Sequence, residues 1–164
     1  MIRTVVSTLC LIFSASMMAP DAKANPNPKS LSEEKVQGYL AGKGMGFAKV
    51  AELNGYPGPA HVLELAEPLQ LTDSQKAETQ KLFETMHSKA VALGKELVTL
   101  ELELDQLFEA QQVTQQKLTD LLLKIGNLNA ELRQTHIEAH LAQRELLTED
   151  QVTHYKTLRA HHHH

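Results

Sequence analysis

Two histidines separated by one helical turn have the clearest potential for chemistry in this sequence. His136 and His140 lie in the segment LNAELRQTHIEAHLAQRELLTEDQ, residues 128–151. Side chains four residues apart share one face of a helix, with Cβ atoms about 6 Å from each other. Both imidazoles can therefore converge on one ion at about 2.0–2.1 Å. The alternative is that one histidine belongs to the apolar stripe of its helix and the other is its solvated neighbour.

Four other residues are candidates to complete a metal site with this pair. With a hairpin turn near residue 113, His87 lies level with about residue 138. His61 and Glu64 are three apart and can share a face of a short helix, which must double back toward the pair. Met45 offers a softer thioether ligand, suited to copper. We expect a divalent metal ion, zinc first, with nickel, cobalt or copper as alternatives. A packed methionine or an exposed histidine is the simpler explanation of each candidate alone.

Two long amphipathic helices are predicted to position these residues, over residues 73–111 and 114–146. Their apolar side chains advance by threes and fours, as on one face of a helix. Only two or three residues connect them, so they must be antiparallel neighbours. The two stripes consist of Leu82, Met86, Ala90, Leu93, Leu97, Leu100, Leu104 and Leu107, and of Leu118, Leu122, Ile125, Leu128, Leu132 and Ala139.

Shorter helices are predicted on both sides of this hairpin. Ser30 and Glu33 have the spacing of a capping box, which predicts a helix over about 31–43. One or two helical turns are expected over 47–53, and Pro59 suits the first position of a helix over 59–67. A final amphipathic helix is expected over 149–159. The fold class is therefore all-α.

A near-repeat of five residues brackets the hairpin. Leu71-Thr72-Asp73-Ser74-Gln75 and Leu147-Thr148-Glu149-Asp150-Gln151 stand 76 residues apart. In each copy the threonine can accept a hydrogen bond from the amide three residues on, while the glutamine reaches back to the threonine amide. Leu71, Thr72, Gln75, Leu147, Thr148 and Gln151 are therefore predicted to be helix-capping residues.

The first 24 residues have the pattern of a cleaved secretory signal. Arg3 supplies a positive start, residues 5–18 are apolar, and Ala22-Lys23-Ala24 is an A-x-A cleavage site. The apolar run is short for a bilayer span, which needs about 20 residues; an uncleaved anchor is the alternative. We expect cleavage after Ala24 and export to the periplasm, then a disordered lead-in over residues 25–30 and a helical domain over 31–159.

The chain ends in four consecutive histidines. Residues 160–164 form either a native His-rich tail or a shortened purification tag. As a flexible tract, such a tail binds metal loosely and does not define a site.

Composition argues against several classes of function. The chain has 16 basic and 20 acidic residues, and loss of the signal would leave 14 and 19, a net charge of −5. Nucleic-acid binding needs a basic stripe, so we expect no nucleic-acid partner. The only cysteine, Cys10, lies inside the signal. The sequence has no nucleophile elbow, H-E-x-x-H or phosphate loop, so we do not expect an enzyme.

These features resemble a known family. The chain is similar to the Spy/CpxP family of periplasmic stress proteins in its paired LTxxQ motifs, Leu71-Thr72-x-x-Gln75 and Leu147-Thr148-x-x-Gln151. It resembles the ZraP/CnrX-like heavy-metal resistance branch, also described as refolding chaperones, in Gly44-Met45-Gly46, in residues 52–59 and in Arg133-x-x-His136-x-x-x-His140. The resemblance covers about residues 31–159.

The resemblance implies a hooked four-helix hairpin, often dimeric, with one of two activities. In sensor-like members, an HxxxH on the second long helix binds a divalent metal with ligands from the N-terminal helices. His136 and His140 match that element, and His61 is the only histidine in the N-terminal helices. In chaperone-like members, a concave cradle holds unfolded clients without ATP.

We therefore expect a periplasmic stress protein that binds divalent metal and acts in heavy-metal resistance or envelope-stress sensing. The alternative is an ATP-independent refolding chaperone in which the histidines are incidental. The expected partners are a second copy of the chain, and either unfolded periplasmic proteins or a membrane signalling protein.

Overall fold

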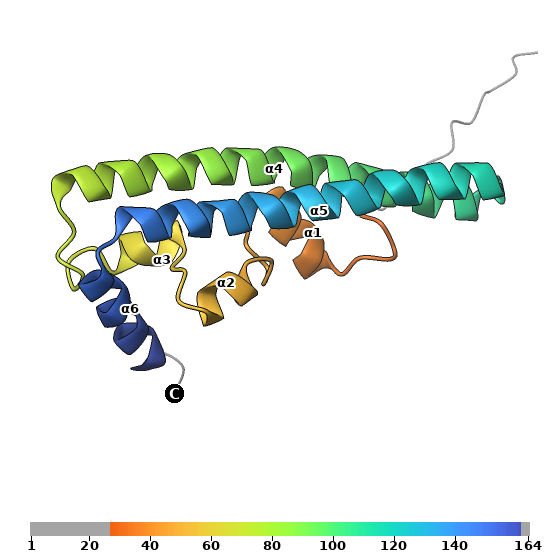
Figure 1. The fold of residues 1–164 in the computed structure, drawn as a ribbon. Coiled ribbons are helices and arrows are strands. Elements are labelled where there is room, and N and C mark those ends of the chain that lie inside the picture. The colour runs from red at the N-terminus through yellow and green to blue at the C-terminus, as the bar shows by residue number, and fades with distance from the viewer. Residues whose placement is uncertain (1–26, 162–164) are drawn as a thin grey trace, which may run out of the picture.

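The computed structural model describes residues 27–161 as an all-helical chain (Figure 1). The predicted signal peptide, the first two residues of the predicted lead-in and residues 162–164 of the tail lie outside the described residues. The helices are α1 (Glu33–Leu40), α2 (Lys49–Leu53), α3 (Pro59–Glu64), α4 (Asp73–Glu109), α5 (Gln115–Leu146) and α6 (Glu149–His161). The predicted fold, two long antiparallel helices flanked by shorter ones, is confirmed.

Helices α4 and α5 form the hairpin that carries the rest of the molecule (Figure 1). Thr114 caps α5 by accepting a hydrogen bond from the Lys117 amide at 3.3 Å. The apolar stripes of the two helices meet in one core, as their spacing predicts. The prediction is wrong for Leu122, which is 48% exposed, because the preceding residue, Leu121, faces the core. The buried residues of that core are Ala90, Leu97, Leu121, Ile125, Leu128 and Leu132.

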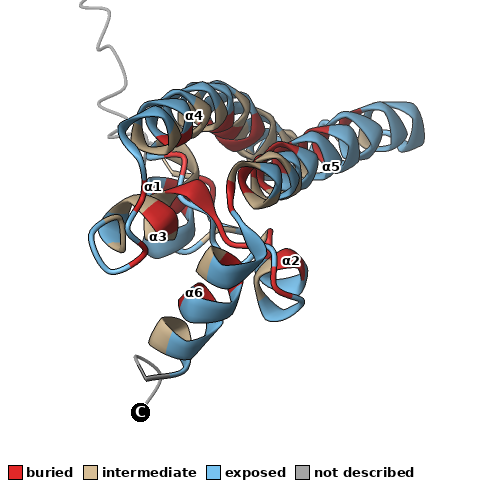
Figure 2. Ribbon diagram, turned by 60° about the vertical axis from the view of Figure 1, so that its left-hand side comes forward, coloured by how far each residue is buried: buried red, intermediate tan, exposed pale blue. Residues whose placement is uncertain are grey.

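The four short helices lie on one side of the hairpin (Figure 1). Helix α1 crosses α4 at Gly94, where a Cβ atom would overlap the carbonyl oxygen of Tyr39. The absence of a side chain at Gly94 therefore allows the two backbones to approach closely. Buried residues of the long helices face each other and the short helices (Figure 2).

The predicted capping box at the start of α1 is wrong. The N-cap is Ser32, whose hydroxyl accepts a hydrogen bond from the Lys35 amide at 3.3 Å. The Ser30 hydroxyl instead donates to Glu101 of α4 at 3.3 Å. The two serines are both possible caps by sequence, and contact with α4 decides which of them begins the helix.

The two LTxxQ motifs are capping boxes, and they also bind each other. Thr72 and Thr148 each accept from the amide of the glutamine three residues on, at 3.2 Å. The side-chain Nε2 atom of Gln75 donates to Gln151 Oε1 at 2.8 Å, and the Nε2 atom of Gln151 donates to Gln75 Oε1 at 3.0 Å. Each glutamine also donates to a backbone carbonyl near the other motif, that of Leu146 or Leu69. We call this reciprocal pair the glutamine clamp.

A second core lies beside the glutamine clamp, where α3 and α6 pack against the base of the hairpin. Its buried residues are Val62, Leu69, Leu71, Leu147, Val152 and Tyr155. The leucine that opens each motif is thus a core residue. Among residues 27–161, no helix combines the length and the apolar character that a membrane crossing requires.

Candidate metal-binding pocket

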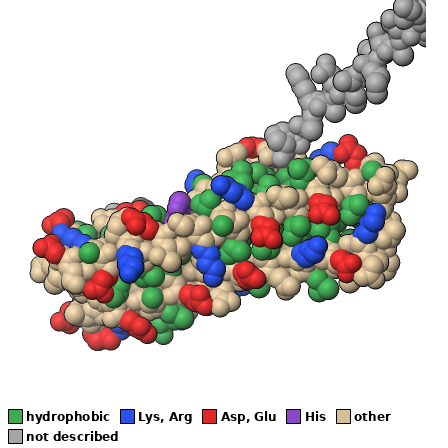
Figure 3. All heavy atoms as spheres, turned by 90° about the horizontal axis from the view of Figure 1, so that it is seen from above, with side chains coloured by type: hydrophobic (Ala, Val, Ile, Leu, Met, Phe, Trp, Pro, Cys, Tyr) green, Lys and Arg blue, Asp and Glu red, His purple; other side chains and the backbone are tan. Residues whose placement is uncertain are grey.

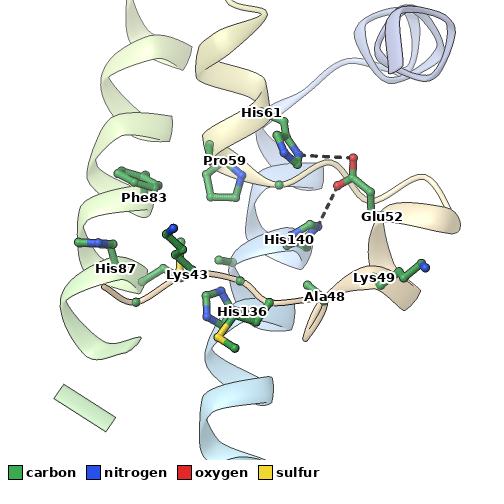
Figure 4. A pocket seen from close by; sticks show the side chains of 18 of the residues that line it. Lys43, Ala48, Lys49, Glu52, Pro59, His61, Phe83, His87, His136 and His140 are labelled. Carbon is green, nitrogen blue, oxygen red and sulfur yellow. Dashed lines mark ion pairs between the residues drawn. The ribbon is translucent and has the colours of Figure 1, made fainter. Parts of the chain in front are cut away.

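A cavity of about 810 Å³ opens between the hairpin and the short helices (Figure 4). Its wall includes residues from α2, α3, α4, α5 and α6, and the loop between α1 and α2. Five of the six predicted ligands line it: Met45, His61, His87, His136 and His140. The fold therefore brings together histidines that are up to 79 positions apart in the sequence. Helix α3 supplies His61, and the antiparallel α4 and α5 supply His87 and the HxxxH pair.

His136 is the most buried of these histidines. The residue is 4% exposed, and its ring stacks on Phe47 with ring centroids 5.8 Å apart. Its Nε2 atom is buried without a hydrogen-bond partner. Burial lowers the pKa of His136, and positive charge on His140 and His87 lowers it further. The imidazole is consequently neutral at pH 7 and keeps a lone pair available for a ligand bond.

His140 and His87 are each held by a backbone carbonyl. The Nδ1 atom of His140 lies 2.7 Å from the Tyr56 oxygen, and the Nε2 atom of His87 lies 3.0 Å from the Ala41 oxygen. A carbonyl oxygen only accepts, so these ring nitrogens must be the donors. In the neutral imidazoles the lone pairs are therefore on His140 Nε2 and His87 Nδ1. Hydrogen bonding of this kind fixes the tautomer and orientation of metal-ligating histidines.

Gly58 makes room for the His140 ring. A Cβ atom on Gly58 would lie 2.7 Å from His140 Nε2 and 2.8 Å from Cε1. Any side chain at this position would push the ring away from the cavity, so the tight turn before α3 and the orientation of His140 depend on each other.

Glu52 of α2, rather than Glu64, is the carboxylate of the pocket. Glu64 of α3 is exposed and does not line the cavity. Glu52 lies 3.6 Å from His61 Nδ1 and 3.7 Å from His140 Nδ1 through its two oxygens (Figure 4). Glu52 was not predicted as a ligand. It is the first residue of the stretch 52–59 that carries part of the family resemblance, and it lies just before the Asn54-Gly55 turn that leads the chain back toward α3.

Helix α6 also reaches the pocket through Glu52. The Tyr155 hydroxyl donates to Glu52 Oε1, and the Arg159 Nε atom lies 3.5 Å from the same oxygen. Burial alone would raise the pKa of Glu52, but the neighbouring His61, the hydrogen bond from Tyr155 and the nearby charge of His140 outweigh it, so the pKa is lowered. Glu52 therefore stays ionised and joins α2, α3, α5 and α6.

Met45 is in an unusual backbone conformation at the edge of the cavity. Its φ angle is +44°, and the glycines on either side of it separate it from both helices. The residue is 40% exposed. Its sulfur packs over Gly38 of α1, where a Cβ atom would overlap Sδ. A left-handed conformation is costly for a residue with a side chain. Gln70 and Gln111 also adopt it, but neither of them lines the cavity.

The donor atoms do not form a closed metal site in the described conformation. Within residues 27–161, no group of three or more His, Cys, Asp or Glu side chains is arranged to hold an ion. The available donors are thus the imidazoles that line one cavity, together with the thioethers of Met45 and Met86.

Comparison with known proteins gives no match for this chain, whether with models of protein families, with curated proteins or with solved structures. The resemblance to the Spy/CpxP family therefore rests on the motif residues alone.

Proposed function

We propose that this chain is a Spy/CpxP-like periplasmic stress protein that binds transition-metal ions in the histidine pocket, in heavy-metal resistance or envelope-stress sensing. One observation carries the proposal: His136 keeps a buried ring nitrogen without a partner, on the wall of a cavity that three other histidines share. A buried polar atom left unpaired costs about 1–3 kcal/mol. A bound ion would remove that cost.

Different residues of the pocket would supply the metal ligands and hold them in position. His136 and His140 supply two lone pairs from one face of α5, and the Tyr56 carbonyl holds the His140 ring in position. His87 supplies a third lone pair from α4. The pair alone gives two ligands, fewer than the four of a tetrahedral site. Further ligands must therefore come from His87, from the α1–α2 loop or from α3 through a small movement toward α5.

Such a movement would convert metal binding into a structural signal. An ion held by α5 and by a short helix ties that helix to the hairpin, and binding to the folded state alone raises its stability by mass action. The position of the short helices would then report the presence of the metal to a second copy of the chain or to a membrane signalling partner.

Calorimetric titration with zinc, nickel and cobalt tests the proposal, in a protein whose four terminal histidines are replaced by serine. We expect micromolar or tighter binding and a higher melting temperature with the ion. His136→Ala should abolish most of the binding. The matched control is His154→Ala, because His154 is an exposed histidine of α6 outside the pocket. Unchanged binding in His136→Ala would refute the proposal.

Refolding-chaperone activity is a second candidate, and exposed apolar side chains favour it. Leu53 and Val50 of α2 are 73% and 50% exposed, and Phe108, Leu122 and Leu123 are exposed toward the tip of the hairpin. Hydrophobic side chains also appear between charges of both signs on the face of the hairpin in Figure 3. Such surfaces bind unfolded chains.

A client-aggregation assay separates the two candidates. If the protein is mainly a chaperone, the metal-free parent and His136→Ala should suppress aggregation equally, while Leu53→Ser should suppress it less. If the protein binds metal but does not reduce client aggregation, the chaperone candidate is excluded and only the metal-binding function remains.

A further inference from the structure

We propose that the ion best matched to this pocket is monovalent copper, bound by His136, His140 and the thioether of Met45. The inference rests on the proposed metal function and specifies its ligand. It differs from the zinc preference suggested by the histidine spacing, because the structure shows which donors the cavity offers.

The first argument is the setting of Met45. Glycine or asparagine would occupy a φ of +44° at less cost than methionine. The two neighbouring glycines leave the backbone free to turn at this position, and the side chain lies at the rim of the cavity. A strained residue with a long, flexible side chain at a cavity edge is explained if that side chain has a ligand to hold.

The second argument is the distance from the loop to the buried imidazole. A Cβ atom built on Gly44 would lie 3.9 Å from His136 Nδ1, so the loop backbone passes directly beside the ring. Met45 is the next residue, and its thioether rests against Gly38 without a side chain beneath it. A change of rotamer, with three rotatable bonds available, can therefore bring the sulfur toward His136.

The third argument is charge. Two neutral imidazoles and a thioether contribute no negative charge, so a dication in this cavity would keep two positive charges and a monocation only one. The desolvation cost rises with the square of the charge, so it is about four times larger for the dication. Glu52 and Arg159 form an ion pair on the cavity wall, so their charges offset each other. Lys43 and Lys49 also line the cavity and add positive potential.

The fourth argument is the chemistry of the donors. Thioether ligands select monovalent copper, whereas carboxylate and water ligands suit harder ions. The part of the chain that the structure describes has no cluster of three nitrogen, thiolate or carboxylate side chains arranged for an ion. A two-histidine, one-thioether set satisfies a soft ion that accepts few ligands.

Two titrations under anaerobic conditions test this inference, again without the terminal histidines. Copper(I) is titrated against a colorimetric copper(I) chelator, and zinc against a zinc indicator. We expect Met45→Leu to weaken copper(I) binding at least about tenfold and zinc binding less than about twofold. Met86→Leu is the matched control, because Met86 lines the same cavity from α4 and should bind copper(I) as the parent does.

X-ray absorption of the copper(I)-loaded parent provides a measurement that does not depend on a variant folding. A sulfur neighbour of copper is expected, and its absence would overturn the inference. Equal copper(I) affinities of the parent and Met45→Leu, with the fold confirmed by circular dichroism, would also overturn it. In both cases, zinc binding that depends on His136 would leave the proposed function standing. Loss of binding to every ion tested would refute both.

Discussion

The glutamine clamp should contribute stability well beyond that of two helix caps. The Gln75 side chain takes part in four hydrogen bonds: it accepts from the Thr72 amide at 3.0 Å and from Gln151 at 3.0 Å, and donates to the Leu146 carbonyl and to Gln151, both at 2.8 Å. Each bond contributes about 0.5–1.5 kcal/mol, and water replaces part of this at a half-buried site. We expect Gln75→Ala to lower the free energy of unfolding by about 2–3 kcal/mol, against about 1 kcal/mol for a simple cap.

A double-mutant cycle in urea isolates the part of this energy that belongs to the clamp. Gln75→Ala and Gln151→Ala share two hydrogen bonds, so the double variant should lose about 1–2 kcal/mol less than the sum of the single variants. Gln80→Ala is the control, because Gln80 bonds only to Glu84 of its own helix and should change stability by less than about 0.5 kcal/mol. Additive single effects would show that each motif acts as an independent cap.

Four further predictions follow from the packing and the pocket. Because the pKa of His136 is lowered in the folded state, the unfolded state takes up the proton first as the pH falls. The contribution of neutral His136 to the free energy of unfolding should be complete above about pH 6.5 and decline as the pH falls toward the lower pKa of the folded state. Urea melts of His136→Leu should show a smaller decline. Gly94→Ala should destabilise by about 1–3 kcal/mol in thermal melts despite the better helix propensity of alanine, because the new methyl group meets the Tyr39 carbonyl; a stabilised variant would contradict the close crossing. Tyr155→Phe should cost about 1.5–3 kcal/mol at pH 7 in urea melts, since the Glu52 carboxylate loses a donor; a change below about 0.5 kcal/mol would show that the contact is incidental. Sedimentation at micromolar concentration should give twice the chain mass, because exposed apolar side chains on the hairpin can be buried against a second copy, and a persistent monomer would argue against that partner.

The long helices could be predicted from sequence because their signals are local. The first was expected over 73–111 and spans Asp73–Glu109, and the second was expected over 114–146 and spans Gln115–Leu146. A repeat of threes and fours over many turns fixes a helix and its buried face. Each LTxxQ cap likewise lies within one turn of its own helix. The short helices were less exact: α3 was expected to reach residue 67 and ends at Glu64.

The contacts between distant elements could not be predicted in this way. A glycine inside a helix, such as Gly94, has no local signal for the helix that crosses it. Glu64 was chosen as a ligand because it is three residues from His61, whereas Glu52 reaches the same histidine from another helix. The reciprocal hydrogen bonds of Gln75 and Gln151 could not be predicted for the same reason. Each glutamine caps its own helix, and that local role already explains its presence in the sequence.

The glutamine clamp joins positions 76 residues apart at the base of the hairpin. The base and the tip of the hairpin should therefore open in separate events. Closing a loop of that length costs about 4 kcal/mol of chain entropy, which the contacts at the base of the hairpin must offset. Helices α3 and α6 are both anchored at this base through the second core. Their amides should therefore exchange hydrogen together, in the same opening event that dismantles the pocket. The tip of the hairpin, around Phe108 and Leu123, lacks such closure and should exchange faster without disturbing the pocket.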